Sequence, residues 1–351
     1  MAARKHRIAV LGLGMAVAPH AKSLLDLRDR VEVAAAYSPT AARRDAFAKQ
    51  FDFPLADDLD AILADPAIDM VAVLTPPNTH RDIVSRAARA GKHILLEKPL
   101  EVSTARAVEL VEACEAAGVT LGVVLQHRFR QAGRRLAALL RENALGPIVG
   151  CSTSIRLWRP QSYYDEPGRG TKARDGGGVL ITQAIHTLDL MLSLAGDVAE
   201  VASYAATTPV HRMETEDMVC AGVRFANGAL GVIDATTTAY PGYSERIEMI
   251  GEKGTAVLSG GELSMRYHDG RTDKVDTPAG SGGTGANPMD FPHDWHRDVI
   301  SDFLDAVEQK RAPKISGREG LRVHGLIDAL LESAASGQRT AVKNYQTTKS
   351  V

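Results

Sequence analysis

The sequence predicts an α/β protein with a doubly wound parallel sheet in its N-terminal part and a mostly antiparallel sheet after it. Two observations carry this prediction. Up to residue 128, short apolar runs alternate with amphipathic stretches, the pattern of parallel strands covered by helices on both faces. From residue 129 on, short runs joined by Gly-, Asn- and Pro-containing turns indicate antiparallel strands. We therefore expect two domains, residues 1–128 and 129–351.

Hydrophobic periodicity locates the expected elements. In the first domain we expect strands at 7–12, 31–36, 69–74, 93–96 and 119–125, and helices at 40–50, 79–90 and 103–117. In the second we expect a strand at 150–158, a helix from the glycines at 176–178 to residue 195, several strands between 198 and 267, and helices at 294–309 and 316–336. The Gly- and Pro-rich segment 277–292 is expected to be a loop.

Composition excludes several classes of protein. With 44% apolar and 24% charged residues the chain is typical of a globular protein, and its formal net charge of −2 argues against a nucleic-acid binder. No apolar run approaches the roughly 18 residues of a membrane span, and the basic N-terminus lacks the apolar stretch of a signal peptide. Cys114, Cys151 and Cys220 show no CxxC spacing, so neither a disulfide framework nor structural zinc is indicated. We expect a cytoplasmic protein without nucleic-acid or membrane partners.

The first strand ends in Gly12-Leu13-Gly14, and a helix is expected to follow. Two glycines at this spacing let the backbone turn tightly and approach a pyrophosphate, which the N–H groups of the helix N-terminus can bind. Val17 stands in place of the third glycine, and a strand-to-helix turn without a ligand is the alternative. The strand before, the helix after and the second strand about 20 residues on favour a dinucleotide-binding Rossmann fold.

The end of the second strand bears on the choice of dinucleotide. Tyr37-Ser38-Pro39 lacks the Asp or Glu that holds the ribose 2′-hydroxyl in NAD-selective folds. Ser38 leaves room for a 2′-phosphate, and Arg43 and Arg44 lie about one helical turn away. These arginines can equally form a solvated helix face. We expect NADP or NAD as the cofactor and favour NADP.

Two further motifs follow the third and fourth strands. The third strand ends at Thr75-Pro76-Pro77-Asn78-Thr79-His80 and the fourth at Glu97-Lys98-Pro99, at the sheet edge where open α/β sheets bind ligands. A lysine in a dry cleft there can serve as a general acid or base. The alternative for Lys98 is an exposed lysine after a buried strand. Pro99 makes a cis Lys98–Pro99 bond possible.

Together, Gly12-x-Gly14, the segment from Thr75 to His80 and Glu97-Lys98-Pro99 resemble the Gfo/Idh/MocA family of oxidoreductases over nearly the whole chain. The resemblance implies that Lys98 assists proton transfer and that the cofactor lies across the strand ends. It also implies a second domain whose large, mostly antiparallel sheet mediates a homodimer or homotetramer. The cofactor site is then expected to include Gly12, Gly14, Met15, Ser38, Thr75, Pro76, Asn78, His80, Glu97, Lys98 and Gln126.

The segment 175–189 carries the second signature. Within an α-helix, Gln183, His186 and Asp189 would share one face because they recur every three residues. The family resemblance implies that His186 orients or deprotonates the reacting hydroxyl. Many members have Asp where this chain has Thr182, so a Lys–Asp–His arrangement is not assumed. The alternative for His186 is a structural histidine within a helix.

Aromatic and basic residues before the triple glycine resemble the corresponding segment in members that act on nucleotide-sugar uronates. Aromatic rings can stack on sugars and arginine can hold a carboxylate or phosphate, although an ordinary surface loop fits nearly as well. The expected substrate contacts are Trp158, Tyr163, Tyr164, Arg169, Thr182, Gln183, His186 and Asp189. We interpret His293-Asp294-Trp295-His296 as a helix start and expect no metal, because its two histidines lack a third partner at suggestive spacing.

Three functions are compatible with these features. The leading one is a dehydrogenase that moves hydride between nicotinamide and a secondary alcohol of a sugar, sugar acid or cyclic polyol, with Lys98 and His186 as the catalytic residues. The second is an NAD-dependent glycoside hydrolase of the same fold. The third is a non-catalytic regulator that binds a sugar or dinucleotide. Retention of Lys98 and His186 counts against the third, and net production of reduced cofactor separates the first from the second.

Overall fold

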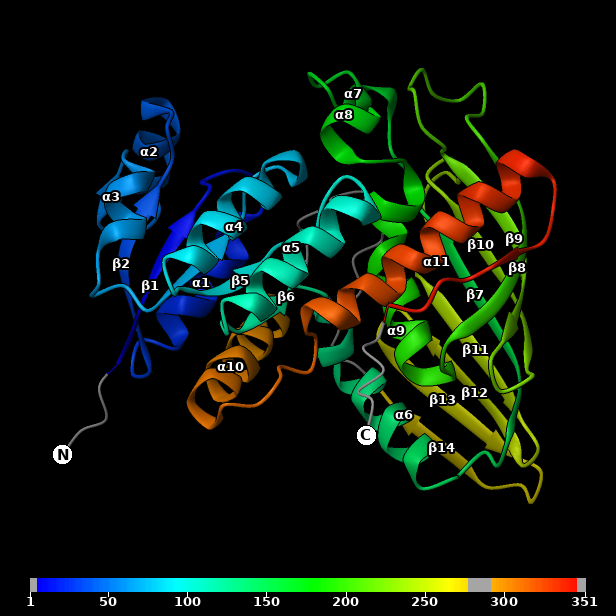
Figure 1. Ribbon diagram of the computed structural model, residues 1–351. Helices are drawn as coiled ribbons and strands as arrows, with labels where there is room; N and C mark the ends of the chain where they lie inside the picture. Colours follow the sequence, from blue (N-terminus) through cyan, green and yellow to red (C-terminus); the bar gives the residue numbers. More distant parts are fainter. Residues whose placement is uncertain (1–4, 277–291, 346–351) are drawn as a thin grey trace. The chain divides into compact units, whose positions relative to one another are not determined.

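The computed structural model describes residues 5–276 and 292–345 (Figure 1). The described residues form two compact units, the first made of 5–125 with 292–320, and the second of 126–276 with 321–345. Residues 292–320, which the sequence analysis assigned to the C-terminal domain, therefore cluster with the N-terminal unit. The expected loop at 277–292 lies outside the described residues except for Pro292.

Unit 1 is built on a six-stranded parallel sheet in the order β3-β2-β1-β4-β5-β6, which is the strand order of the Rossmann fold. The residues Ile8–Leu11, Met70–Val73 and Ile94–Leu96 of its central strands are all apolar and buried, because helices cover both faces of the sheet. The predicted doubly wound sheet is confirmed, with one short edge strand that periodicity did not reveal. The strands are β1 (His6–Leu11), β2 (Val31–Tyr37), β3 (Leu55–Ala56), β4 (Met70–Val73), β5 (His93–Leu96) and β6 (Leu121–Val123).

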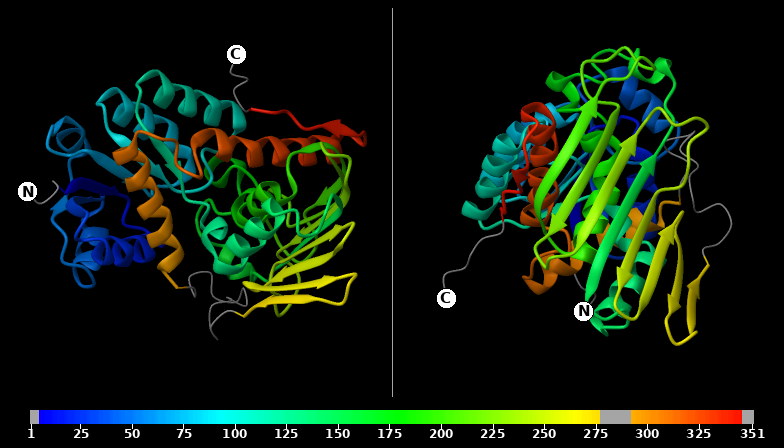
Figure 2. Two further views of the ribbon diagram at one scale, coloured as in Figure 1. Left: turned by 90° about the horizontal axis from the view of Figure 1, so that it is seen from below. Right: turned by 90° about the vertical axis from the view of Figure 1, so that its right-hand side faces the viewer.

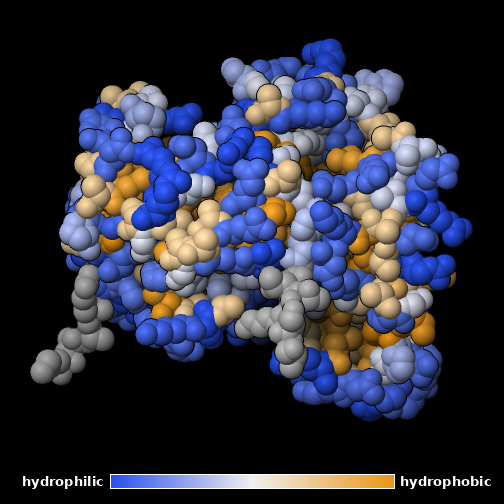
Figure 3. Space-filling model, viewed as in Figure 1, coloured by the Kyte–Doolittle hydropathy of each residue, from blue (hydrophilic) through white to orange (hydrophobic). Residues whose placement is uncertain are grey.

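The helices of unit 1 are amphipathic and turn their apolar sides to the sheet. In the face shown in Figure 3, hydrophilic residues predominate on their outward sides. The helix α10 comes from far along the sequence and packs against α1, where the Ser23 hydroxyl donates to the His293 carbonyl. The elements are α1 (Val17–Asp26), α2 (Ala41–Ala48), α3 (Leu59–Ala64), η1 (Pro77–Thr79), α4 (His80–Arg89), α5 (Thr104–Ala116) and α10 (Asp294–Gln309).

Unit 2 contains a nine-stranded sheet in the order β14-β13-β12-β11-β7-β10-β9-β8-β15. All its pairs are antiparallel except β7 with β10, so the predicted mostly antiparallel sheet is confirmed. The strands are β7 (Ile148–Arg156), β8 (Val198–Ala206), β9 (Met218–Phe225), β10 (Leu230–Thr236), β11 (Arg246–Gly251), β12 (Gly254–Ser259), β13 (Glu262–Tyr267), β14 (Thr272–Val275) and β15 (Thr340–Ala341).

Buried and exposed residues alternate along these strands, so one face of the sheet packs inside the unit and the other faces outward. Among the described residues of unit 2, no helix covers the outward face (Figure 2). The inward face packs against α6 and α9, and α11 is tied to β8 through the Ser203 amide, which donates to the Ser333 hydroxyl at 3.1 Å. The helical elements are η2 (Gln126–Phe129), α6 (Gln131–Arg141), α7 (Gln161–Tyr164), α8 (Lys172–Asp175), η3 (Leu180–Ala184), α9 (Ile185–Ala195) and α11 (Gly317–Ser336).

The run Lys172–Ala195 corrects one expectation from the sequence. By length and composition it could cross a membrane, with a mean hydropathy of 1.4, although no run of that kind was expected. Within the protein, however, 78% of its most apolar window is buried. Burial of this extent is that of a core helix, which is apolar all round because protein surrounds it.

Candidate functional site

The turn after β1 separates the roles of its two glycines. Gly12 has a φ of +109°, and a Cβ there would lie 2.8 Å from the carbonyl carbon of Leu74 at the end of β4. Gly14 faces open space, because no described atom lies within 4 Å of the position that a Cβ would take there. Helix α1 follows at Val17, and no side chain caps its first N–H groups in the described structure. Gly12 thus lets β1 and β4 approach closely, and Gly14 leaves room for a pyrophosphate beside the helix N-terminus.

Neighbouring residues differ in exposure in a way that fits this arrangement. Met15, in the same turn, is 53% exposed, whereas Val17 is buried. The third glycine of the usual motif serves close helix–strand packing. Val17 instead fills that position with a buried side chain, and the β1–α1 turn forms around it.

At the end of β2, the Ser38 hydroxyl is buried and accepts the amide of Thr40 at 3.3 Å. Arg44, from the first turns of α2, donates from Nη1 to the Ser38 carbonyl at 2.6 Å and lies 3.5 Å from an Asp57 carboxylate oxygen. Arg43 is exposed. One of the two arginines is therefore folded back over the strand end, where Rossmann folds hold the adenosine ribose.

The turn after β4 presents Pro76 and Asn78 at the surface and keeps Thr75 half-buried. The Thr79 hydroxyl contacts the Thr75 hydroxyl and the Pro76 carbonyl, each at 2.7 Å, which fixes the turn. His80, which the sequence analysis expects to contact the cofactor, has a fully buried side chain. Its ring nitrogens face backbone carbonyls on two turns, so its place is structural.

The turn after β5 carries Lys98. One Glu97 carboxylate oxygen accepts the Lys98 amide at 3.0 Å, and the other lies 2.8 Å from Nε2 of His20 on α1. Burial alone would raise the pKa of Glu97, but the His20 hydrogen bond and nearby positive charge bring that pKa below its ordinary value. The Lys98–Pro99 bond is cis, as the sequence suggested. Glu97 is therefore a carboxylate that anchors the Lys98 backbone.

His296 joins this cluster from α10. The start of that helix lies where it was predicted, but the ring packs edge-on against His20, with centroids 4.9 Å apart. Nitrogen and oxygen atoms of His20, Glu97 and His296 lie within 4.8 Å of one another. Burial lowers the pKa of His296 to about 3, so its ring is neutral at neutral pH. Sequence spacing could not reveal the cluster because its members come from three distant segments.

In unit 2, the segment after the triple glycine departs from an α-helix. Leu180–Ala184 forms a π-helical turn before α9, a feature that is frequent at functional sites. Gly178 is required there, because a Cβ would lie 1.8 Å from the Glu216 carbonyl oxygen. The Glu216 carboxylate accepts the amides of Gly178 and Leu180, at 3.0 and 3.2 Å, and so occupies the N-terminus of this helical run. Burial raises the pKa of Glu216 despite these bonds.

The π-turn changes the predicted face of Gln183, His186 and Asp189. Asp189 is fully buried, and its two carboxylate oxygens accept hydrogen bonds from Nη2 and Nε of Arg128 at 2.6 and 2.7 Å. Asp189, which the sequence analysis expects to contact the substrate, is therefore held inside the unit by an ion pair with Arg128. Gln183 instead lies 3.4 Å from the Tyr163 hydroxyl, which a three-residue period would not predict.

His186 is half-buried and stacks on His127 of η2, with ring centroids 4.9 Å apart. His127 contacts Arg130, whose guanidinium also lies 3.1 Å from Glu245. His127, Arg130 and Glu245 line a small pocket within unit 2, together with Thr187 and Leu190. His127, Arg130 and Glu245 were missed from the sequence, since no local motif links residue 245 to residue 127.

Thr182 and Gln126 also have defined surroundings. The Thr182 hydroxyl donates to the Gly178 carbonyl at 2.6 Å and contacts the Gln183 side chain, so it serves the π-turn in place of a carboxylate. Gln126 is buried, and its side-chain oxygen has no hydrogen-bond partner in the described structure. An unpartnered buried acceptor is unusual and suits a ligand N–H.

The predicted substrate loop is held together by its own side chains. The Arg169 guanidinium stacks 4.3 Å over the Tyr163 ring, donates to the Tyr163 hydroxyl at 2.9 Å and pairs with Glu166. Trp158 packs edge-on against Tyr240 at 5.5 Å. Arg169 is therefore engaged within the loop, where it supports Tyr163.

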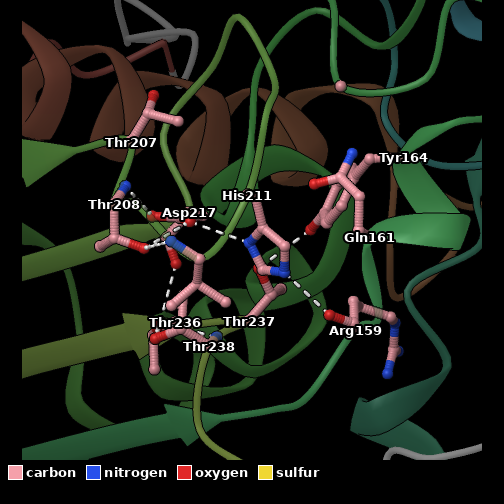
Figure 4. A network of polar contacts seen from close by, with 12 residues as sticks. Arg159, Gln161, Tyr164, Thr207, Thr208, His211, Asp217, Thr236, Thr237 and Thr238 are labelled. Carbon is pink, nitrogen blue, oxygen red and sulfur yellow. Dashed lines mark hydrogen bonds and ion pairs between the residues drawn. The ribbon is translucent and has the colours of Figure 1, made fainter.

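A buried histidine fixes the base of this loop (Figure 4). His211 lies 2.9 Å from the Asp217 carboxylate and 2.8 Å from the Arg159 carbonyl. The Tyr164 hydroxyl contacts the Thr237 hydroxyl at 2.9 Å, and its ring is buried. Tyr164 is thus part of the loop's foundation, and Trp158 and Tyr163 remain as half-buried rings of the loop.

Two family models match the chain. Residues 6–125 match the model described as an oxidoreductase family with an NAD-binding Rossmann fold. Residues 134–257 match the GFO/IDH/MocA C-terminal domain. Together the two matches span more than half of the sequence.

Similar proteins include solved structures and curated relatives. The WlbA dehydrogenase from Bordetella pertussis, in complex with NADH and UDP-GlcNAcA, is 29% identical with a TM-score of 0.83, over 97% of this chain and 99% of that one. Levoglucosan dehydrogenase, in complex with NADH and levoglucosan, is 25% identical with a TM-score of 0.85, over 97% and 100%. The myo-inositol 2-dehydrogenase of Thermotoga maritima is 27% identical over 324 residues, 90% of this chain and 92% of the relative.

The two glycines of the first turn give a matched test. Gly12→Ala is expected to destabilise the protein by about 2 kcal/mol or more, because its φ is left-handed and its Cβ meets the β4 backbone. Gly14→Ala is expected to keep the melting temperature but weaken NADH binding at least about tenfold, or 1.4 kcal/mol. Thermal unfolding and calorimetry measure the two effects. Equal losses of stability in both variants would contradict this division of roles.

Proposed function

The chain belongs to the GFO/IDH/MocA family of nicotinamide-dependent oxidoreductases, and we propose that it transfers hydride between the cofactor and a secondary alcohol of a sugar, sugar acid or cyclic polyol. The observation that carries the proposal is the Lys98 turn. It lies at the carboxyl end of β5, on the same sheet edge as the Gly12–Gly14 turn, and the Glu97 carboxylate anchors its backbone. Parallel strands present their ligand-binding turns on this edge.

The residues present fit a dinucleotide. Gly14 leaves open space next to the first N–H groups of α1, and these groups can bind a pyrophosphate. When bound, the nicotinamide supplies the acceptor or donor of the hydride. Lys98, as a neutral amine, takes the hydroxyl proton when the alcohol is oxidised and returns it in the reverse direction. His186 orients the hydroxyl.

For the substrate we propose a sugar ring that carries a carboxylate or a nucleotide. A relative that matches almost the whole chain was solved with UDP-GlcNAcA, a sugar of this kind. Trp158 and Tyr163 offer half-buried rings in the loop before the triple glycine, and aromatic rings stack well on sugars. Because Arg169 is already paired with Glu166, its contribution is to hold Tyr163 rather than to bind the anion itself.

We propose that NADP(H) binds at least as well as NAD(H), although the relatives above were solved with NADH. No carboxylate stands in Tyr37-Ser38-Pro39 to repel a 2′-phosphate. The Arg44 guanidinium lies over the Ser38 carbonyl at the strand end, where a 2′-phosphate would compete for its charge with the exposed Asp57 carboxylate 3.5 Å away.

A second copy of this chain is the proposed partner of the open sheet face. Large apolar side chains stand outward from its strands, with exposed fractions of 85% for Tyr204, 56% for Leu230, 50% for Val232 and 46% for Ile250. Side chains of this type gathered on a flat face are typical of protein interfaces. Arg156 and Asp234 pair on the same sheet and provide polar groups beside the apolar residues.

The catalytic role of Lys98 is tested by Lys98→Met. We expect turnover to fall by about 10² to 10⁴, the usual cost of losing a positioned acid or base, while cofactor binding stays close to normal. His186→Ala is also expected to lower kcat. The assay follows absorbance of the reduced nicotinamide with UDP-sugar uronates, free sugars and inositols. Near-normal kcat in Lys98→Met would contradict the proposed role, and activity confined to non-carbohydrate alcohols would contradict the substrate class.

Calorimetry with NADPH and NADH tests the cofactor choice. In Arg44→Ala we expect NADPH to bind about tenfold to a hundredfold more weakly, the usual worth of a charge-assisted hydrogen bond, with little change for NADH. Arg43→Ala is the matched control, since that side chain is exposed, and should bind both dinucleotides as the parent does. A tenfold preference of the parent protein for NADH would contradict the proposal.

The proposed association of two or four chains is tested by placing a charged side chain on the open face of the sheet. Light scattering after gel filtration should give the parent protein a mass of two or four chains. Val232→Lys should shift it toward the monomer without lowering the melting temperature, because residue 232 is half exposed in one chain and becomes buried on association. A monomeric parent protein would contradict the proposal.

A further inference from the structure

One buried imidazole joins the two turns that follow β4 and β5. His80 is the first residue of α4, and its side chain is fully buried. Its Nδ1 lies 3.1 Å from the Pro99 carbonyl oxygen and 3.2 Å from that of Leu100, and its Nε2 lies 2.8 Å from the Thr75 carbonyl oxygen. The residues immediately after Lys98 are therefore tied to the neighbouring ligand-binding turn.

A second buried imidazole holds the residue before Lys98. His20, on α1, is also fully buried, and its Nε2 lies 2.8 Å from one Glu97 carboxylate oxygen. The other Glu97 oxygen accepts the Lys98 amide at 3.0 Å. The Lys98 backbone is thus fixed from α1 through Glu97 and from α4 through the carbonyls of Pro99 and Leu100.

The chemistry of these contacts makes the imidazoles hard to replace. Every atom that faces the His80 ring nitrogens in these contacts is a carbonyl oxygen. Burial lowers the pKa of His80, which favours the neutral ring, and a neutral ring donates from one nitrogen only, either to the Thr75 carbonyl or to the Pro99 and Leu100 carbonyls. An apolar side chain of similar size would leave those carbonyls, or the Glu97 carboxylate in the case of His20, without a buried partner. The turn would then shift to recover hydrogen bonds.

A shift of this kind has kinetic consequences. An acid or base works on a proton within hydrogen-bond reach, and a misplacement of about 1 Å can cost about 10² in rate. We propose that His80 and His20 are positioning residues that fix the Lys98 turn for proton transfer. The inference rests on the role proposed for Lys98 above.

The experiment compares His80→Leu and His20→Leu with His80→Gln and His20→Gln, whose amides keep an N–H donor. The Leu variants should lose about 10² in kcat, while the Kd for NADH changes no more than about fivefold. The Gln variants should regain at least about tenfold of that loss. In parallel, the rate at which trinitrobenzenesulfonate labels Lys98, read by peptide mass spectrometry, should differ from the parent protein in the Leu variants. A role in stability alone would not change this rate in folded protein.

His93→Leu is the matched control. The His93 side chain likewise makes a hydrogen bond, here as the acceptor of the Thr120 amide at 3.0 Å, but it stands at the opposite end of β5. This variant should melt at a lower temperature than the parent protein, while its kcat and the labelling rate of its Lys98 stay unchanged.

The outcomes separate the two proposals. If Lys98→Met keeps its activity, the catalytic role of Lys98 fails, whereas the labelling rates still report whether the imidazoles hold its turn. If Lys98 is essential and the imidazole variants match the parent protein in kcat and labelling, the positioning proposal is overturned. If the Leu variants do not fold, the Gln variants decide, because they keep an N–H donor. Folded Gln variants that lose both kcat and the labelling rate of the parent protein would overturn the positioning proposal.

Discussion

The contact between the ends of β1 and β4 is the constraint on which the candidate cofactor site depends. Gly12 brings the first turn against the Leu74 carbonyl with no space for a side chain. This approach occurs where the strand order reverses direction, between β1 and β4, and there the carboxyl ends of the strands leave a crevice for ligands. The turns after β4 and β5 then lie next to one another, and the ring of a single residue, His80, contacts both.

Unit 2 uses a related device at a different helix. Gly178 lets the backbone of Glu216 approach the start of the π-turn. The Glu216 carboxylate then accepts hydrogen bonds from the first N–H groups of the helix. In unit 1 the comparable N–H groups at α1 have no side-chain cap among the described residues. The protein therefore neutralises one helix N-terminus with its own carboxylate and keeps the other for an anion from outside.

The sequence predicted those parts of the fold that local periodicity determines. The central strands and long helices of unit 1 alternate in sequence with clear apolar patterns, and α10 begins and ends where it was expected. The two-residue strand β3 and the short helix α3 have too few residues to show a period. The π-turn was missed because one extra residue in a helix leaves the composition unchanged and moves every later side chain to another face.

Local sequence motifs also name site residues without showing what surrounds their side chains. Motif membership located His80 and Asp189, yet both side chains are fully buried with protein partners. His20 and Glu245 were not found at all, because their contacts join segments more than 70 residues apart in the sequence. A motif indicates that a certain residue type is required at a position. Only the atoms around the side chain show whether that residue can contact a ligand or instead holds the fold.

This distinction matters for how the fold supports catalysis. Lys98 has a flexible side chain, and a flexible amine is a poor acid or base unless its backbone is fixed, since its own rotamers already spread its position. The described structure places buried, hydrogen-bonded groups on each side of that backbone and leaves the lysine side chain itself half-buried. The hydrogen bonds are thus concentrated on the backbone of the turn, which supports the proton-transfer role proposed for Lys98. Since this turn is held by contacts within unit 1, the role proposed for Lys98 does not depend on the sequence of the loop that carries Trp158 and Tyr163 in unit 2.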